Sequence, residues 1–241
     1  MTKQITGYHA VVRKALVDSI SMPAFILLTS MMGFGSLASQ SGFDTGMASF
    51  ASVFIWGLPG QLAMVELTAA GHNLFSIVLA CSLANARFMP MVLSFLPHLF
   101  NKPESLPKRL LYAQLLSVNS WAVSLRAFPY VDMEWRRVYY LTFASSIILA
   151  AVIGTMLGVY ISNEFPTSVV LGLVFLSPLF FALVLSSTKG LSYRLSLLSG
   201  CLVIPAAHYF FPQVDLLIAG VIGGTLGFTL ARLPLLKNKF S

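Results

Sequence analysis

Apolar stretches of about twenty residues recur along the whole chain, and they limit what it can fold into. Hydrophobic residues make up 57% of the sequence and charged residues only 10%, whereas an ordinary soluble domain carries about 25% charged residues. A soluble fold of this size leaves about a quarter to a third of the surface of its chain in water. It could not hide so much apolar area, so the sequence predicts a chain that is dissolved in lipid.

Helices are the expected way to cross that lipid. A helix of about 20 residues spans the roughly 30 Å of hydrocarbon in a bilayer. No water satisfies backbone groups there, and the alternating strands of a membrane barrel are absent from the sequence. The predicted fold class is therefore an all-α polytopic membrane protein.

Apolar periodicity and helix breakers predict about eight transmembrane segments in one transporter domain, residues 1–241. The segments cover residues 15–39, 44–70, 73–100, 110–128, 138–161, 167–187, 191–209 and 214–233. The fourth segment is the most polar and holds Gln114, Asn119 and Arg126. A re-entrant fourth segment, which would leave about seven crossings, is the open alternative.

Lysine and arginine indicate sidedness, because they stay on the cytoplasmic side. With about eight crossings, both termini are predicted to be cytoplasmic and most basic residues share that side. The loop 101–109 is the exception, since it holds Lys102, Lys108 and Arg109 but falls outside. Residues 1–14 lead into an apolar segment without a small-residue cleavage site, which predicts a retained first span.

The second segment contains a cluster of helix breakers in mid-span, namely Gly57, Pro59 and Gly60, preceded by Trp56 and followed by Gln61. Proline removes a backbone donor, and glycine adds local freedom, so the helix is expected to break or kink there. Freed backbone groups at this depth are tolerated inside protein or beside a water-filled cavity. The cluster favours a substrate site, and a static packed kink is the alternative.

Arg87 is the deepest charge of the third segment, about 14 residues or roughly 20 Å from its start. A charge at this depth is expected to face the bundle interior. It either pins helices together or receives a substrate carboxylate, with Asn85 as a hydrogen-bonding neighbour. Glu66 is about 7 Å deep by helical rise, so a direct ion pair with Arg87 is not favoured. Glu66 is either a buried proton carrier or a solvated interfacial group.

Other features of the sequence exclude several function classes. The net charge of +7 arises from scattered residues at segment ends, so no nucleic-acid surface is expected. No metal-ligand pair, phosphate-binding glycine loop or nucleophile elbow occurs, so neither an enzyme nor a cofactor is predicted. Asn119 fits interhelical hydrogen bonding, and Gly154 with Gly158 fits close helix packing.

A family resemblance rests on short motifs that occur in order along the chain: Gly33-Phe-Gly35, Ser41-Gly-Phe43, Gly60-Gln61, Ala70-Gly71, Asn85-Ala-Arg87 and Leu96-Pro97-His98. Together they resemble the AzlC family of branched-chain amino-acid permeases. The resemblance implies a bacterial inner-membrane exporter of leucine, valine, isoleucine or methionine. It also implies a small hydrophobic AzlD-like subunit as partner and coupling to the proton gradient.

Two departures from the family pattern bear on the site. Gly57-Leu-Pro-Gly60 stands where the family commonly has a run of small residues, which leaves the substrate open. Asn119-Ser120 stands where many members have Asp-Glu, which leaves the proton-coupling position open between Asn119 and Glu66. The leading hypothesis is export of small hydrophobic amino acids, whose side chain would rest on Trp56, Phe54, Phe88 or Met89. A membrane scaffold or sensor without transport activity of its own is the alternative.

Overall fold

The computed structural model describes residues 5, 7–20, 22–100, 104–162, 164, 166–186, 191–210 and 215–232. Their α-helices, in chain order, are α1 (Tyr8–Ser19), α2 (Met22–Gln40), α3 (Thr45–Phe54), α4 (Leu58–Ala69), α5 (Leu74–Asn85), α6 (Phe88–Phe95), α7 (Leu106–Gln114), α8 (Val118–Ala127), α9 (Arg136–Tyr160), α10 (Thr167–Ser186), α11 (Leu191–Phe210) and α12 (Asp215–Arg232). Short 3₁₀ helices follow α6 (η1, Leu96–His98) and α8 (η2, Phe128–Tyr130) and precede α9 (η3, Met133–Trp135). The predicted all-helical class is confirmed for these residues, which form no strand.

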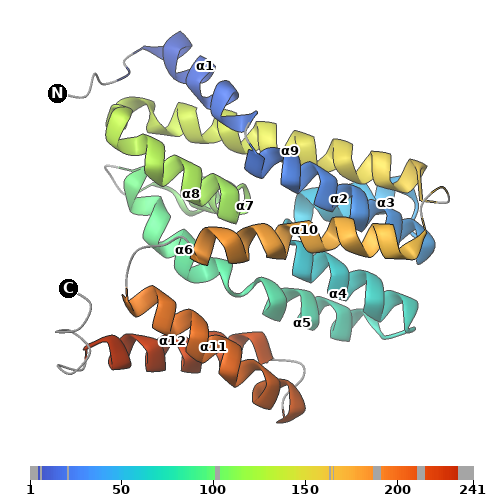
Figure 1. Ribbon diagram of the computed structural model, residues 1–241. Coiled ribbons are helices and arrows are strands. Elements are labelled where there is room, and N and C mark those ends of the chain that lie inside the picture. The colour runs from blue at the N-terminus through green and yellow to red at the C-terminus, as the bar shows by residue number, and fades with distance from the viewer. Residues whose placement is uncertain are drawn as a thin grey trace.

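The long helix α9 lies against α2, and the two run in the same direction (Figure 1). A Cβ added at Gly154 would lie 2.5 Å from the Leu28 carbonyl oxygen, and one at Gly158 would meet the Met32 backbone. Near the ends of both helices, Ser39 Oγ is 3.0 Å from Ser162 Oγ. Glycine therefore permits the close approach of these helices, as predicted for Gly154 and Gly158.

Helices α3 and α4 form a hairpin rather than one crossing. Asp44 begins α3 by accepting a hydrogen bond from the Met47 amide, at the end where α2 finishes. The chain breaks after Phe54, returns as α4 and turns at Gly71, whose φ of 73° favours glycine. Gly71 leads at once into α5, which starts from the same end (Figure 1).

Helices α5 and α6 run in the opposite direction to α2 and α9, and this shows that the α3–α4 hairpin starts and finishes at the same end of the molecule. Together, α5 and α6 are one apolar stretch bent by 49°. The stretch finishes beside the start of α9, where Arg137 Nε donates to the Leu99 carbonyl at 3.1 Å. Since α5 starts at the far end, both outer ends of the α3–α4 hairpin lie there too. The predicted break is confirmed, but the prediction that residues 44–70 cross the bilayer is corrected.

Helices α7 and α8 form a second hairpin that comes from the other end. Before α7, Glu104 forms an ion pair of 2.9 Å with Arg137 at the start of α9. After α8, the Phe128 carbonyl accepts from Arg136 Nη2 at 3.1 Å. Both outer ends of the hairpin therefore lie beside the first turn of α9. The re-entrant alternative for the fourth segment is the arrangement that the structure contains, with the hairpin starting at Leu106.

Few of the described helices are long enough to cross a bilayer by themselves. By length and composition, one described stretch, 133–160, is long and apolar enough to span a bilayer. The count rises to three if the bent pairs α1–α2 and α5–α6 each count as one span. Shorter apolar helices occur within α3, α10, α11 and α12. Helix α10 covers α2 (Figure 1), while α11 and α12 pack chiefly on each other through Gly223 and Gly227.

Basic residues gather at one end of this arrangement. The end that holds the start of α9 carries Lys108, Arg109, Arg126, Arg136 and Arg137. The loops at the opposite end, residues 41–44, 70–73 and 161–166, contain no lysine or arginine. The hairpins thus bring residues 104–109 to the same end as Arg136 and Arg137, whereas the prediction of about eight crossings put them on opposite sides.

Candidate functional site

The tips of the two hairpins contact each other through an exposed glutamine side chain. Gln114, the last residue of α7, donates from Nε2 to the carbonyl oxygens of Val53 at 3.2 Å and Phe54 at 3.0 Å. These carbonyls belong to the last turn of α3, which has no intrahelical partners for them. One amide side chain therefore joins hairpins that enter from opposite ends.

Two further amide side chains satisfy the broken end of α3. Gln61 is fully buried and donates to the Ala51 carbonyl at 3.2 Å. Asn85, at the end of α5, donates to the Ile55 carbonyl at 3.0 Å. The Ala51 carbonyl also accepts from the Ile55 amide at 3.0 Å, so the Gln61 bond is its second. A buried carbonyl without a donor costs about 1–3 kcal/mol, so the Asn85 bond to Ile55 stabilises the break. The break is thus a built feature, held by amides from three other helices.

Asn85 also accounts for both glycines of the break. A Cβ added at Gly60 would lie 2.6 Å from Asn85 Nδ2, and one at Gly57 would meet Asn85 Oδ1. The thiol of Cys81 donates to the Gly60 carbonyl at 3.2 Å. Helices α4 and α5 therefore pack closely because residues 57 and 60 lack side chains. Gly60, Gln61 and Asn85 were predicted to bind substrate; in the structure they contact one another or the end of α3, and none of them lines the cavity described below.

The start of α4 contrasts with the end of α3 because it has no cap. Its N-cap residue, Gly57, offers no side-chain oxygen, and Pro59 has no amide hydrogen. The first amides of a helix have no intrahelical acceptor and carry a partial positive charge. Helix α8, by comparison, is closed by a capping box between Ser117 and Ser120. The uncapped start of α4 lines a cavity.

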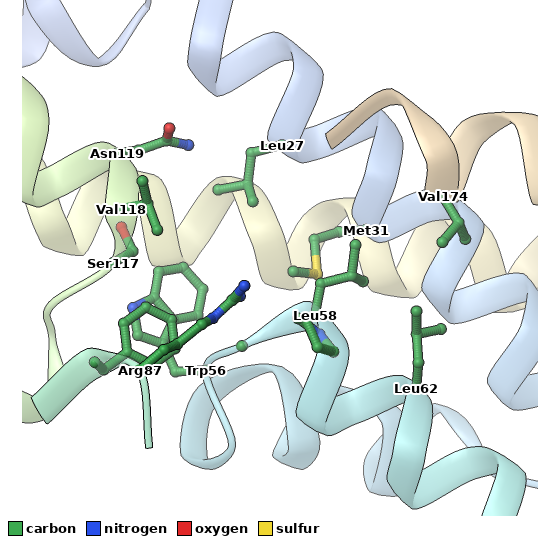
Figure 2. Close-up of a pocket in the computed structure, with 13 residues that line it drawn as sticks. Leu27, Met31, Trp56, Leu58, Leu62, Arg87, Ser117, Val118, Asn119 and Val174 are labelled. Carbon is green, nitrogen blue, oxygen red and sulfur yellow. The ribbon is translucent and has the colours of Figure 1, made fainter. Parts of the chain in front are cut away.

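This cavity has a volume of about 220 Å³ and lies between the hairpin tips and α2. Figure 2 shows Leu27 and Met31 of α2 on one side and Leu58 and Leu62 of α4 on another. Val174 of α10 closes part of the wall. The walls are mostly apolar, and the polar side chains among the lining residues are those of Arg87, Ser117 and Asn119, with the indole of Trp56.

Arg87 supplies the one formal charge among the lining residues. It lies at the bend between α5 and α6, and its side chain points into the cavity between Leu27 and Leu58 (Figure 2). Its guanidinium carbon lies 5.2 Å from the centre of the Phe88 ring. In the described part of the chain, it forms neither an ion pair nor a hydrogen bond. A guanidinium without a counter-charge suits a ligand carboxylate.

Asn119 lines the same cavity, and only 7% of it is exposed. Its side-chain amide has no hydrogen-bond partner among the described residues, although buried amides normally have one. Figure 2 shows it across the cavity from Arg87. Glu66, the other predicted coupling residue, is exposed near the far end of α4 and does not line the cavity.

Trp56 occupies the break itself and separates two spaces. Its φ of 36° is in the left-handed region, which costs a bulky residue about 1–3 kcal/mol. Only 6% of it is exposed, and its buried indole nitrogen has no partner among the described residues. It lines the cavity and also a second pocket, of about 360 Å³, towards Cys81 and Gln114. Trp56 is therefore a strained partition between them.

The structure brings five of the nine predicted site residues to the cavity, namely Trp56, Gly57, Pro59, Arg87 and Asn119. The sequence did not predict that Leu27 and Met31 of α2, or Val118, line the cavity, because they are apolar and resemble other residues of the apolar segments. Nor did it predict the bond between the hairpin tips. The polarity of Gln114 was the available signal, but nothing in the sequence identified its partner.

Loss of the Gln114 bonds is expected to lower stability. Gln114→Ala removes two exposed hydrogen bonds to the Val53 and Phe54 carbonyls, at a cost of about 0.5–1.5 kcal/mol for each bond. The measurement is the thermal unfolding midpoint of the purified protein in detergent. Arg109→Ala, on the same helix, is the control and is expected to leave the midpoint unchanged. Equal midpoints for the two variants would show that the tips are not held in this way.

Short helices meet within an apolar helical bundle, beside a cavity that one unpaired arginine lines. This arrangement is that of a polytopic α-helical membrane protein with an internal polar site. The AzlC protein family model matches residues 23–164, and the chain belongs to the AzlC family. The match extends from α2 to the turn after α9, so it includes both hairpins. The family is associated with membrane transport rather than catalysis.

Two relatives from different strains of Helicobacter pylori are described only as uncharacterized membrane proteins. One is 34% identical over 97 residues, covering 39% of this chain and 42% of the relative. The other is 34% identical over 95 residues, covering 39% of this chain and 41% of the relative. The chain thus matches about two fifths of the length of each. No solved structure matches the chain closely enough to be counted as similar.

Proposed function

We propose that this chain, residues 1–241, is the large subunit of a secondary exporter of branched-chain and other small hydrophobic amino acids: leucine, valine, isoleucine and methionine. The observation that carries this proposal is the apolar cavity of about 220 Å³ with the unpaired Arg87 and the uncapped start of α4. Membership in a family associated with transport supports it.

The substrate carboxylate would lie between Arg87 and the first amides of α4, where positive charge is concentrated. Its aliphatic side chain would contact Leu27, Met31 and Leu62 of the apolar wall. Of the aromatic surfaces expected from the sequence, Trp56 and Phe88 support this pose because both line the cavity.

The opposed hairpins suggest how access would alternate. Helix α2, the α3–α4 hairpin and α5–α6 follow one another, and the same α5–α6 stretch then leads into the α7–α8 hairpin and α9 in the opposite direction, so the two units share α5–α6. Inverted repeats around a site formed by discontinuous helices are common among secondary transporters. Each hairpin would close the cavity from its own side of the membrane.

We place both termini and the loop 101–109 in the cytoplasm of a bacterium, with the chain in the inner membrane. The gathering of basic residues at that end supports this orientation. Labelling distinguishes it from about eight crossings, which would put residue 72 inside and residue 105 outside. In a chain with Cys81→Ser and Cys201→Ser, His72→Cys is expected to react with an impermeant thiol reagent in intact cells. Ser105→Cys is expected to react only after permeabilisation, and the reverse pattern would contradict the hairpins.

We further propose an AzlD-like small membrane subunit as partner and coupling to the proton gradient. The exposed Glu66 on α4 and the position of Asn119 stay the candidate coupling sites. Asn119 lies in the cavity, but its amide does not titrate near neutral pH. Coupling through that position would therefore use hydrogen bonding rather than proton uptake by Asn119.

The direct test is efflux from proteoliposomes that contain this chain and its partner. Vesicles preloaded with radiolabelled leucine are expected to release it faster than vesicles with the partner alone. Complexes that assemble but never accelerate release would favour the scaffold or sensor alternative. Varying the internal and external pH in the same vesicles tests whether a proton gradient drives the release.

A further inference from the structure

We propose that the cavity recognises its substrate through the carboxylate alone, so that it also takes small branched carboxylates that lack an amino group, including keto acids. This inference rests on the proposed function, because it concerns the same cavity. It goes beyond that function by assigning a second chemical class of substrate.

The charges around the cavity support this inference. Among the described lining residues, Arg87 is charged and none is acidic. The one carboxylate on α4, Glu66, is exposed towards the far end of that helix. An amino acid carries no net charge, so its binding would leave the positive charge of Arg87 uncompensated. A monocarboxylate would neutralise that charge.

Carbonyl oxygens are the other groups that receive a substrate ammonium in broken helices. Here the carbonyls at the end of α3 accept hydrogen bonds from Gln61, Gln114 and Asn85. Phe54 and Ile55 line the second pocket rather than the cavity, and Trp56 lies between the two spaces. An ammonium group in the cavity would therefore find these acceptors already engaged and on the other side of an aromatic ring.

Hydrogen-bond donors without a partner also line the cavity. The guanidinium of Arg87 and the uncapped start of α4 both donate, and neither has an acceptor among the described residues. The amide of Asn119 is more than nine-tenths buried, unpartnered and part of the cavity wall. Its NH₂ group suits a keto oxygen next to the carboxylate, since a keto acid presents only acceptors.

The experiment compares four probes on the unmodified chain reconstituted with its partner: leucine, the keto acid of leucine, isocaproate and leucinamide. Isocaproate lacks the ammonium of leucine, and leucinamide lacks its carboxylate. Each unlabelled probe competes with labelled leucine efflux, and binding is measured separately by thermal shift. The keto acid and isocaproate are expected to compete at concentrations no higher than leucine. Leucinamide is expected to need about tenfold more, because it cannot bind the guanidinium.

The outcomes separate the inference from the proposed function. If leucine binds and is exported while neither deaminated probe competes, the inference is overturned and the proposed function stands. If the deaminated probes bind and leucine neither binds nor moves, the amino-acid function fails and carboxylate recognition stands. If leucinamide alone matches leucine, ammonium recognition replaces the inference. Binding of none of the probes overturns both.

A variant provides an independent measurement. Asn119→Asp places a carboxylate in the cavity and is expected to shift the preference towards leucine over isocaproate by about tenfold. Asn73→Asp is the matched control, because Asn73 caps α5 at the far end and aspartate caps equally well. If folded Asn119→Asp had the same preference between leucine and isocaproate as the unmodified chain, residue 119 would not contact the substrate.

Discussion

Replacing Arg87 by alanine is expected to reduce leucine efflux by about 10- to 150-fold, which corresponds to the roughly 1.5–3 kcal/mol of a hydrogen bond to a charged group. Arg87 carries the one charge that lines the cavity in the described chain, and no residue there neutralises it. Its removal would leave a substrate carboxylate in an apolar cavity without a counter-charge. Initial efflux rates from proteoliposomes with equal amounts of protein are the measurement.

Two variants separate substrate binding from a purely structural role of Arg87. Arg87→Lys keeps the charge but loses the planar fork, so it is expected to retain part of the efflux. Arg126→Ala removes an exposed arginine from α8 and is expected to leave efflux unchanged. If Arg87→Ala exported leucine at the normal rate, Arg87 would not be the carboxylate ligand. If Arg87→Ala lowered the thermal unfolding midpoint and left efflux unchanged, Arg87 would have a structural role in holding helices together.

Gly158→Ala is expected to cause the largest loss of stability, about 1–3 kcal/mol or more, because overpacking is costly where the neighbour cannot move. A Cβ at this position would overlap the backbone of Met32, and helix backbone has no rotamer to change. Helices α2 and α9 would have to separate along their contact. The measurement is thermal or denaturant unfolding of the purified protein, followed by tryptophan fluorescence.

Gly172→Ala in α10 is the matched control, because a Cβ there would meet nothing within 4 Å. Alanine favours a helix over glycine by about 1 kcal/mol, so this control is expected to be neutral or slightly stabilising. Equal stability of Gly158→Ala and Gly172→Ala would contradict the close contact between α2 and α9.

The sequence predicted the local features of the site well. Proline and glycine at positions 57, 59 and 60 required a break, and the structure contains it between Phe54 and Leu58. The depth of Arg87 followed from counting helical rise along one segment, and the residue lines the cavity. These features depend on neighbouring residues or on a single helix, so the sequence carries them directly.

The sequence could not predict whether the chain turns back or continues after each break. A helical hairpin and a broken crossing have the same apolar content, so hydropathy does not separate them. Halves of about 10 to 12 residues are only about 15–18 Å long, which suits a return from mid-membrane. The misplaced charge of loop 101–109 was the one sign of this, and it concerned the fourth segment rather than the second.

Composition by itself determined that the chain lies in lipid and is helical, because backbone groups in hydrocarbon must find partners within their own segment. Local sequence determined where a helix breaks and how far along its segment Arg87 lies. Only the tertiary structure decided that two hairpins meet, that Gln114 bridges their tips and that Asn85 fills the space beside Gly57 and Gly60. Those contacts join residues far apart in the chain, and they depend on how the helices pack, which no local pattern encodes.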